Sequence, residues 1–370
     1  MKLFLIAGEP SGDRLGAALM AGLKQLTPVE FHGIGGPMMA REGLTSLFPM
    51  AELSIMGLAE VLPKYFALKR RIAEAAKAVT ALHPAALITI DSPDFCLRVA
   101  AQVRAANPRQ KTMHYVAPSV WAWRPHRAAK MARVIDHVLA LLPFEPPYMT
   151  AAGMTCDFVG HPVVSDPQAT EAERHLMTGT GPLILALPGS RRTEVTRLAP
   201  VIGQTLALIR AQHPDTRVAL PTVPHLADLV RDLTRDWPIR PQIIEDAATK
   251  RAAFAMADVA LAASGTVSLE LAAAGTPMVI AYDMHPVTLW LTRRALLIDT
   301  VTLVNLVSET RTVPEFIGLN CKPDRIAPAL LSLLQSPHVQ DAAMALTLQR
   351  LGQGGEAPGL RAARSVLAHL

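Results

Sequence analysis

The sequence predicts an α/β protein with two Rossmann-like domains, each built on a doubly wound parallel sheet. Short apolar runs that end in glycine, proline or polar turns alternate with helix-length segments, and this alternation occurs twice along the 370 residues. Such an alternation is typical of parallel sheets that are covered by helices on both faces. The chain is also longer than the roughly 250–300 residues at which a single core usually splits.

The first half of the chain predicts one domain, over residues 1–165. Its buried strands are expected at residues 3–7, 31–34, 87–90, 113–117 and 138–142. The alternation then pauses over residues 160–182, where glycine and proline are frequent, and a stretch of this kind marks a linker between domains.

The second half predicts a domain of the same architecture, over residues 166–345. Its strands are expected at residues 183–187, 217–220, 242–244, 259–262 and 278–281. A helical tail over residues 346–370 follows, and the sequence leaves open whether it crosses back to the first domain or is exchanged with a neighbouring subunit. Ligands of open α/β sheets lie beyond the carboxyl ends of the strands, so two facing domains would enclose one cleft.

The composition excludes several classes of protein. Hydrophobic residues make up 50% of the chain, yet no apolar run approaches the roughly 20 residues of a membrane-spanning helix. The net charge of +5 is compatible with nucleic acid, an anionic membrane or phosphorylated substrates, and because no nucleic-acid motif accompanies it we expect no nucleic-acid partner. The three cysteines lack the paired spacing of disulfide or zinc frameworks, which predicts a cytoplasmic protein without structural zinc.

A glycine-containing turn follows the first strand, at residues 8–13, and opens a helix expected over residues 13–26. Backbone N–H groups at such a helix start bind polar or anionic ligands, which makes Ser11 and Gly12 candidate binding residues. The alternative is that Ser11 or Asp13 simply caps the helix.

The strand expected at residues 87–90 is followed by two carboxylates, Asp91 and Asp94. Asp94 stands just before a helical run and is best interpreted as its N-cap. Asp91 has no such structural role, and a carboxylate at a strand end can accept the proton of an attacking hydroxyl. Asp91 is therefore the candidate general base, with a buried structural carboxylate as the alternative.

Aromatic side chains gather after the next strand, in a chain that is only 5% aromatic. His114, Trp121 and Trp123 lie within one short stretch, where the aromatic faces could stack on the apolar face of a sugar. It is an equal alternative that the two tryptophans cover the edge of the core.

Two turns of the second half combine small residues with polar ones. In the first, Ser190 and Arg191 follow a strand, and a guanidinium there can neutralise a diphosphate leaving group unless it is an ordinary solvated arginine. In the second, the three residues Ser264, Gly265 and Thr266 open another helix where backbone amides can meet phosphate. Glu270, one turn further on, could reach ribose hydroxyls, or be an ordinary exposed carboxylate.

Residues 55–71 combine dense apolar residues with Lys64, Lys69, Arg70 and Arg71. This composition is that of a segment that inserts shallowly into a membrane surface and binds anionic lipid. A core helix with a basic solvent face is the alternative.

Seven blocks of sequence, in the same order, resemble the lipid-A-disaccharide synthase family. The most specific is His114-Tyr115-Val116-Ala117-Pro118-Ser119-Val120-Trp121-Ala122-Trp123, and the others are residues 7–13, 91–95, 142–145, 160–162, 187–191 and 264–266. Together they extend over nearly the whole chain.

The resemblance implies a GT-B fold and an inverting glycosyl transfer without metal or cofactor. UDP-2,3-diacylglucosamine would donate its sugar to 2,3-diacylglucosamine 1-phosphate, in lipid A biosynthesis, at the cytoplasmic surface of the inner membrane. By position, Asp91 matches the family's proposed base, Arg191 its essential arginine and Asn305 an asparagine that usually follows proline, where this chain has Val304. A homodimer is also expected.

Two other functions remain open from the sequence. The nearer is a UDP-N-acetylglucosamine 2-epimerase-like enzyme, which would share the nucleotide half without needing a lipid-facing segment. The other is a non-catalytic protein that binds lipid or a small molecule, and release of UDP from a UDP-sugar would exclude it.

Overall fold

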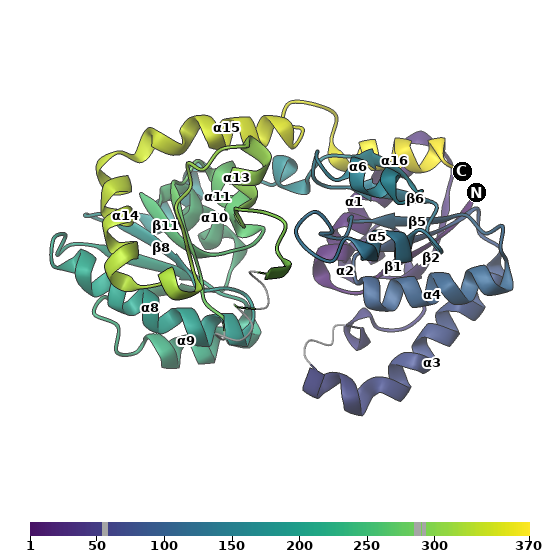
Figure 1. Ribbon diagram of the computed structural model, residues 1–370, viewed down its shortest axis with the longest axis horizontal. Coiled ribbons are helices and arrows are strands. Elements are labelled where there is room, and N and C mark those ends of the chain that lie inside the picture. The colour runs from purple at the N-terminus through teal and green to yellow at the C-terminus, as the bar shows by residue number, and fades with distance from the viewer. Residues whose placement is uncertain (54–57, 285–289, 291–293) are drawn as a thin grey trace. The chain divides into compact units, whose positions relative to one another are not determined.

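The computed structural model describes residues 1–53, 58–284, 290 and 294–370, and within residues 58–65 it describes the backbone only. The chain divides into two compact units. The first unit comprises residues 1–165 together with 354–370, and the second comprises residues 166–353. Both units are α/β, as the sequence predicts, with parallel sheets covered by helices (Figure 1).

The sheet of the first unit contains, among the described residues, seven parallel strands in the order β3-β2-β1-β4-β5-β6-β7. The strands are β1 (Lys2–Ala7), β2 (Glu30–Ile34), β3 (Thr45–Ser46), β4 (Ala86–Ile90), β5 (Thr112–Tyr115), β6 (His137–Ala140) and β7 (Thr155–Phe158). The helices of this unit are α1 (Pro10–Leu26), α2 (Pro37–Arg41), η1 (Met50–Glu52), α3 (Leu58–Leu82), α4 (Pro93–Ala106), α5 (His126–Met131), α6 (Pro146–Ala151), η2 (Pro162–Ser165) and α16 (Pro358–Ala368).

Both faces of this sheet are buried, which explains why its central strands are continuous apolar runs. Alternate residues of β1 point to opposite faces: Leu3 and Leu5 pack in one core cluster, and Phe4 and Ile6 in the other. The cluster of Leu3 and Leu5 includes residues of both α1 and α16, so the last helix of the chain completes the core of the first unit. Figure 1 shows α16 beside α1, near both ends of the chain.

Two glycines allow α1 and α16 to approach closely. A Cβ atom on Gly22 would lie 2.6 Å from the carbonyl oxygen of Gly359, and a Cβ on Gly359 would lie 2.5 Å from that of Ala18. Any larger residue at either position would push the helices apart.

The tail predicted from residue 346 has two parts in the structure. Residues up to 353 belong to the second unit, and only the last 17 residues, 354–370, belong to the first.

The sheet of the second unit contains six parallel strands among the described residues, in the order β10-β9-β8-β11-β12-β13. The strands are β8 (Leu183–Leu187), β9 (Arg217–Pro221), β10 (Gln242–Ile244), β11 (Val259–Ala263), β12 (Met278–Tyr282) and β13 (Glu315–Ile317). The helices are α7 (Glu171–Arg174), η3 (His175–Met177), α8 (Arg192–Arg210), η4 (Pro224–Leu226), α9 (Ala227–Thr234), α10 (Ala247–Met256), α11 (Val267–Ala274), α13 (Leu303–Ser308), η5 (Gly318–Asn320), α14 (Pro323–Gln335), η6 (Pro337–Gln340) and α15 (Asp341–Arg350).

The stretch predicted as a linker, residues 160–182, contains more structure than its composition indicates. Thr170 and Glu173 form a reciprocal capping box at the start of α7, and α7 packs on α10. Glu173 also accepts hydrogen bonds from the guanidinium of Arg251 in α10. The later part of this stretch is thus an integral part of the second unit.

Within the described part of the chain, no helix is both long and apolar enough to cross a bilayer.

Candidate active site

The predicted catalytic residue of the first unit, Asp91, and the predicted binding residue Ser11 lie at the carboxyl edge of its sheet. Asp91 directly follows β4, and Ser11 stands in the first turn of α1, which follows the neighbouring strand β1. The Ser11 hydroxyl donates to Asp91 Oδ2 at 3.4 Å, so the structure brings these two predicted residues together. The alternative that Ser11 caps α1 is wrong, because Glu9 occupies the N-cap and no side chain caps that helix end.

The backbone at Asp91 is strained. Asp91 and Ser92 both have left-handed conformations, with φ of 53° and 42°, and Val116 after the neighbouring strand has φ of 85°. Such conformations cost of order 1–3 kcal/mol each in non-glycine residues and cluster at functional sites. Two hydrogen bonds hold the Asp91 carboxylate in this turn, because Oδ1 accepts the Ser92 N–H at 2.9 Å and Oδ2 accepts from the Ser11 hydroxyl at 3.4 Å.

Gly8 makes this arrangement possible, since a Cβ atom at that position would lie 2.5 Å from Ser92 Oγ. Ser92, and not Asp94, is the N-cap of α4, so the expectation that Asp94 caps this helix is wrong. Asp94 is exposed in the first turn of α4.

Asp13 has a structural role that differs from the predicted alternative. It is buried, and its carboxylate accepts the backbone N–H groups of Gly36, Met38 and Met39 at 2.8–3.0 Å. It therefore caps α2 and not its own helix. Gly12 is also explained by packing, because a Cβ there would lie 3.2 Å from the Ile90 carbonyl oxygen on β4.

The two tryptophans of the aromatic block have different environments. Trp121 is buried, its ring meets Phe144 edge to face at 5.1 Å, and its Nε1 donates to Glu145 Oε1 at 3.2 Å. Trp121 thus covers the core edge, as the alternative interpretation predicts. Trp123 is 38% exposed, with the Arg124 guanidinium 4.1 Å above its ring, and is the member of the pair that solvent reaches.

Two buried ionisable groups support this edge of the sheet. His114 lies within β5, with its Nδ1 2.7 Å from the Thr89 hydroxyl, and burial lowers its pKa to about 4 against the opposing effect of Asp91. Glu145 is only 4% exposed and accepts the backbone N–H groups of Leu141 and Leu142 in addition to Trp121. Burial raises the pKa of Glu145 to about 7, while these three hydrogen bonds act to lower it.

In the second unit, the turn after β8 is held together by Glu194. Its Oε2 accepts the backbone N–H groups of Ser190 and Arg191 at 3.2 and 3.3 Å, and its Oε1 accepts from Arg191 Nη1 at 2.9 Å. Gly189 has φ of 117°, and a Cβ there would lie 2.5 Å from Glu194 Oε2. The Arg191 side chain is 61% exposed, so Glu194 orients a guanidinium that solvent and ligands can reach. The sequence prediction named Ser190 and Arg191 and missed Glu194.

The turn after β11 lies at the same edge, because β11 pairs with β8. Thr266 is exposed at the N-cap of α11, and Gly265 has φ of 154° with open space where a side chain would stand. Ser264 Oγ donates to the Val301 carbonyl oxygen at 3.3 Å. Glu270, one turn into α11, forms an ion pair with Lys250 at 2.7 Å. The residues of these two turns that are predicted to bind the nucleotide are therefore neighbours on one edge of the second sheet.

Asn305 is buried, and its side-chain amide bonds to protein groups. Its Nδ2 donates to the Val313 carbonyl oxygen at 2.9 Å, and its Oδ1 accepts the Val313 N–H at 3.0 Å. Both bonds join α13 to the segment that precedes β13. The direct role of Asn305 in this structure is to fix that segment.

Two parallel-sheet α/β units, each with glycine turns and polar side chains at the carboxyl edge, define a fold of the GT-B class. The chain is similar to UDP-GlcNAc 2-epimerase from Neisseria meningitidis, solved with UDP-GlcNAc, with a TM-score of 0.69 and 12% identity over 100% of this chain and 99% of that one. It is also similar to Acinetobacter baumannii MurG, with a TM-score of 0.58 and 13% identity over 100% and 99% of the two chains. At such identities these likenesses concern the fold alone.

The family follows from sequence. A family model described as lipid-A-disaccharide synthetase matches residues 3–360. The chain is 62% identical over 384 aligned positions to lipid-A-disaccharide synthase of Ruegeria pomeroyi, covering 100% of this chain and 96% of that protein. It is 48% identical over 375 positions to the synthase of Rhodospirillum centenum, covering 99% and 94%. The chain therefore belongs to the lipid-A-disaccharide synthase family, and it is a glycosyltransferase of lipid A biosynthesis.

Proposed function

We propose that the protein transfers 2,3-diacylglucosamine from UDP to 2,3-diacylglucosamine 1-phosphate, giving the β-1,6-linked disaccharide 1-phosphate and UDP. The reaction inverts the anomeric centre and uses no metal ion. The observation that carries this proposal is the carboxylate of Asp91, which is held in a strained turn at the carboxyl end of β4 and paired with Ser11. The names of the relatives, all lipid-A-disaccharide synthases, support the choice of substrates.

Asp91 acts as the general base. One oxygen accepts the proton of the acceptor's 6-hydroxyl while that hydroxyl oxygen bonds to the anomeric carbon of the donor. The bond from this carbon to the UDP oxygen breaks on the opposite side, and the electron pair leaves with UDP. The N–H of Ser92 orients the carboxylate throughout the step, and the hydroxyl of Ser11 orients it until the acceptor hydroxyl takes its place.

Negative charge grows on the diphosphate as it leaves, and groups of the second unit are suited to stabilise it. Arg191 supplies a permanent positive charge, and the start of α11 at Thr266 supplies oriented backbone N–H groups. Preorganised donors of this kind are effective because they need no reorganisation as the charge develops. Ser190, Ser264 and Gly265 bind the phosphates in this proposal, and Glu270 binds the ribose.

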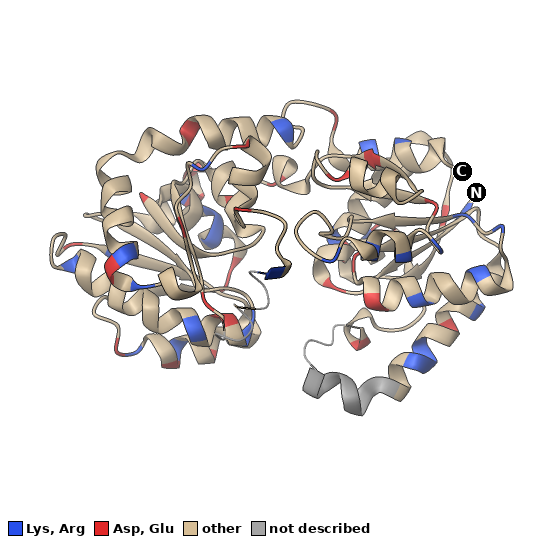
Figure 2. Ribbon diagram, in the orientation of Figure 1, with Lys and Arg blue, Asp and Glu red and all other residues tan. Residues whose placement is uncertain are grey.

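The protein acts at the cytoplasmic surface of the inner membrane, where the acyl chains of both substrates reside, and we propose α3 as the contact. Phe66 is 80% exposed, Lys69 and Arg70 are exposed, and basic segments lie along the described part of α3 in Figure 2. Arg71 is excluded from this role, because it bonds to Glu52 and Glu74.

The segment predicted to bind lipid also includes residues 55–65, with Lys64 among them. These residues lie outside the part of the chain whose side chains the structure describes. That the protein forms a homodimer is proposed from the family resemblance alone.

The decisive experiment compares Asp91→Asn with the matched control Asp94→Asn, three residues away and exposed in the first turn of α4, the helix that follows Asp91. Asparagine keeps the shape of aspartate but cannot take a proton, so transfer by Asp91→Asn should fall roughly 10²–10⁴-fold. Its melting temperature and UDP affinity should match those of the wild type and of the control. The assay is single-turnover transfer from UDP-2,3-diacylglucosamine, with products identified by mass spectrometry.

Three outcomes would contradict the proposal. A normal rate in Asp91→Asn would exclude Asp91 as the base. A product that is an epimerised UDP-sugar would indicate an epimerase, and binding without release of UDP would indicate a non-catalytic binding protein.

A further inference from the structure

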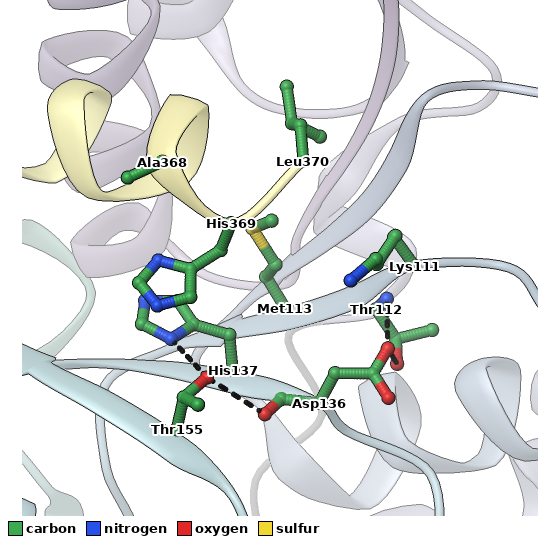
Figure 3. A pocket seen from close by; sticks show the side chains of 9 residues that line it. All are labelled: Lys111, Thr112, Met113, Asp136, His137, Thr155, Ala368, His369 and Leu370. Carbon is green, nitrogen blue, oxygen red and sulfur yellow. Dashed lines mark hydrogen bonds between the residues drawn. The ribbon is translucent and has the colours of Figure 1, made fainter.

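A cluster of two histidines and an aspartate lies in the first unit, at the amino end of the sheet and away from Asp91. His137 is the first residue of β6, Asp157 lies in β7, and His369 directly follows α16. The cluster borders a pocket of about 330 Å³ whose lining includes Lys111 and Thr155. Figure 3 shows the rings of His137 and His369 lying face to face at this pocket.

Hydrogen bonds determine which nitrogens carry protons. Ser365 Oγ donates to Asp157 Oδ2 at 2.6 Å, so it accepts from His137 Nε2 at 2.8 Å. His137 Nδ1 then accepts from the Thr155 hydroxyl at 2.8 Å. His369 Nδ1 lies 2.9 Å from the Ser365 carbonyl oxygen and donates to it, which leaves Nε2 as the unprotonated nitrogen of that ring.

We propose that His137, Asp157 and His369 form a binding site for a divalent transition-metal ion of the zinc type. One ligand atom from each residue lies within 4.8 Å of the other two. Asp157 Oδ2 is 3.8 Å from His137 Nε2 and 3.8 Å from His369 Nδ1. Bonds of about 2.0–2.2 Å from nitrogen and oxygen to zinc place the ligands of one tetrahedral ion roughly 3.3–3.6 Å apart, so the separations are close to those around a bound ion, whereas the ring orientations must change.

The donor set matches the chemistry of such an ion. Two imidazoles and one carboxylate suit zinc, cobalt, nickel and iron better than magnesium or calcium, which prefer oxygen ligands alone. Imidazole binds metal in its neutral form. The adjoining pocket has room for water as the remaining ligand.

Two local changes accompany binding. The rings of His137 and His369 stack with centroids 3.7 Å apart and an interplanar angle of 17°, so their lone pairs point in parallel planes and cannot meet at one ion. His369 must therefore turn so that Nδ1 leaves the Ser365 carbonyl oxygen and becomes the ligand atom, while its proton moves to Nε2. The ring is able to turn because it lies beyond the last residue of α16 and is partly exposed. The Ser365 hydroxyl gives up its bond to His137 Nε2, which loses its proton, while His137 Nδ1 gains a proton and donates it to the Thr155 hydroxyl. The Thr155 hydroxyl then donates to the Asp136 carbonyl oxygen, 3.2 Å away, so His137 remains a neutral imidazole in its other tautomer.

The site would fasten the last helix to the sheet. His369 belongs to the end of the chain, while His137 and Asp157 stand on neighbouring strands more than 200 residues earlier. A ligand that binds the folded chain better than the unfolded one stabilises it by mass action. The sequence prediction of no metal rested on cysteine spacing and on the family resemblance, and these three residues are too far apart in sequence to form a recognisable motif.

The test is a zinc titration of the full chain after removal of metal with a chelator, in competition with a chromophoric chelator. We expect one tight ion per chain, a higher melting temperature with zinc, and visible absorption bands when cobalt replaces it. His369→Ala and Asp157→Asn should each weaken binding tenfold or more, because each loses a direct ligand, and changes even beyond the ligands typically cost about 10–100-fold.

The matched control is His32→Ala, which removes a histidine that also pairs with a carboxylate, Glu30, in the same unit. It should bind zinc like the wild type. His137 is buried, so a variant there could fail to fold, and the two partly exposed ligands carry the test instead. Zinc binding that persists in both His369→Ala and Asp157→Asn would be adventitious and would overturn the proposal, as would a wild type that binds none.

Discussion

Glu194 has two roles in the turn after β8, since it accepts backbone N–H groups and it orients the Arg191 side chain. Replacing Glu194 by glutamine separates these roles. A glutamine carbonyl oxygen can still accept the backbone N–H groups of Ser190 and Arg191, which Glu194 Oε2 accepts now. Its amide group, however, would present N–H donors to the Arg191 guanidinium, which also has only donors. The Glu194→Gln variant should therefore keep the cap of α8 and release the Arg191 side chain.

The expected loss of rate follows from the freedom that Arg191 gains. An arginine side chain loses up to about 2 kcal/mol of rotamer freedom when it is fixed. The single contact with Glu194 Oε1 at 2.9 Å restricts part of that freedom before substrate binds. If the contact accounts for roughly two thirds of this rotamer free energy, its loss should slow transfer about tenfold, since 1.4 kcal/mol corresponds to a factor of ten in rate. That is less than the 10²–10³-fold loss expected on removal of the charge itself in Arg191→Ala.

The effect on stability should be small. Arg191 is 61% exposed, so its ion pair with Glu194 three residues away contributes only about 0.3–0.5 kcal/mol. Asp228→Asn is the control, because Asp228 also forms an ion pair with an arginine three residues away, Arg231, at 2.7 Å on α9, although Asp228 is more exposed than Glu194. The control should lose a similar amount of stability and no activity.

A double-mutant cycle on the single-turnover rate tests whether Glu194 acts through Arg191. In the Arg191→Ala background, Glu194→Gln should cause no further loss, which corresponds to a coupling energy of about 1.4 kcal/mol. If the two losses multiply instead, Glu194 acts on the substrate or on the turn by another route. If Glu194→Gln alone keeps the wild-type rate, the contact does not position Arg191 for catalysis.

The remaining predictions concern pH and the membrane. Burial raises the pKa of Glu145 from 4.5 to about 7, so the native state binds more protons than the unfolded state between these values, and the free energy of unfolding should fall as pH rises through that window. This contribution is about 3 kcal/mol and should vanish in Glu145→Gln, which denaturant titrations of both proteins at pH 4.5 and pH 7.5 would measure; an identical pH dependence would contradict it. Lys69→Glu combined with Arg70→Glu should reduce binding to anionic vesicles at least about 30-fold, because each basic residue contributes about 1 kcal/mol of attraction. Lys322→Glu with Arg325→Glu is the control in sedimentation, and equal losses in both double variants would exclude α3 as the specific contact.

Much of the fold could be predicted because its central strands are buried on both faces. β1, β4, β8 and β11 are almost fully buried apolar runs that end in turns, and the sequence pattern indicates each of them. The strands that the pattern missed are short and lie at sheet edges. β3 has two residues and β13 three, and β7 is only partly buried, so their sequences carry too little periodicity to distinguish them from loops.

From the sequence, candidate site residues could be assigned to the end of each strand separately, but the residues that position them could not be identified. Asp91 and Arg191 stand out because polar residues that follow buried strands come to the ligand-binding edge of a parallel sheet. Glu194 and Glu145 were missed because each lies within a helix or loop sequence in which an acidic residue looks like solvated surface. Their partners are determined by backbone conformation, such as the φ of 117° at Gly189, which no composition or spacing encodes.

The two carboxylates at the active edge of the first sheet show how environment divides their roles. Glu145 accepts three N–H groups, is almost fully buried, and is protonated over much of the range below pH 7, so it can neither reach a substrate nor serve as a free base. Asp91 is only half-buried, and one of its oxygens accepts a single, long bond from the exposed hydroxyl of Ser11. A substrate hydroxyl can replace that bond at little cost. Because a general base must both be reached and be able to take a proton, Asp91 fits the catalytic role, and Glu145 fits that of an anchor for Trp121 and the turn after β6.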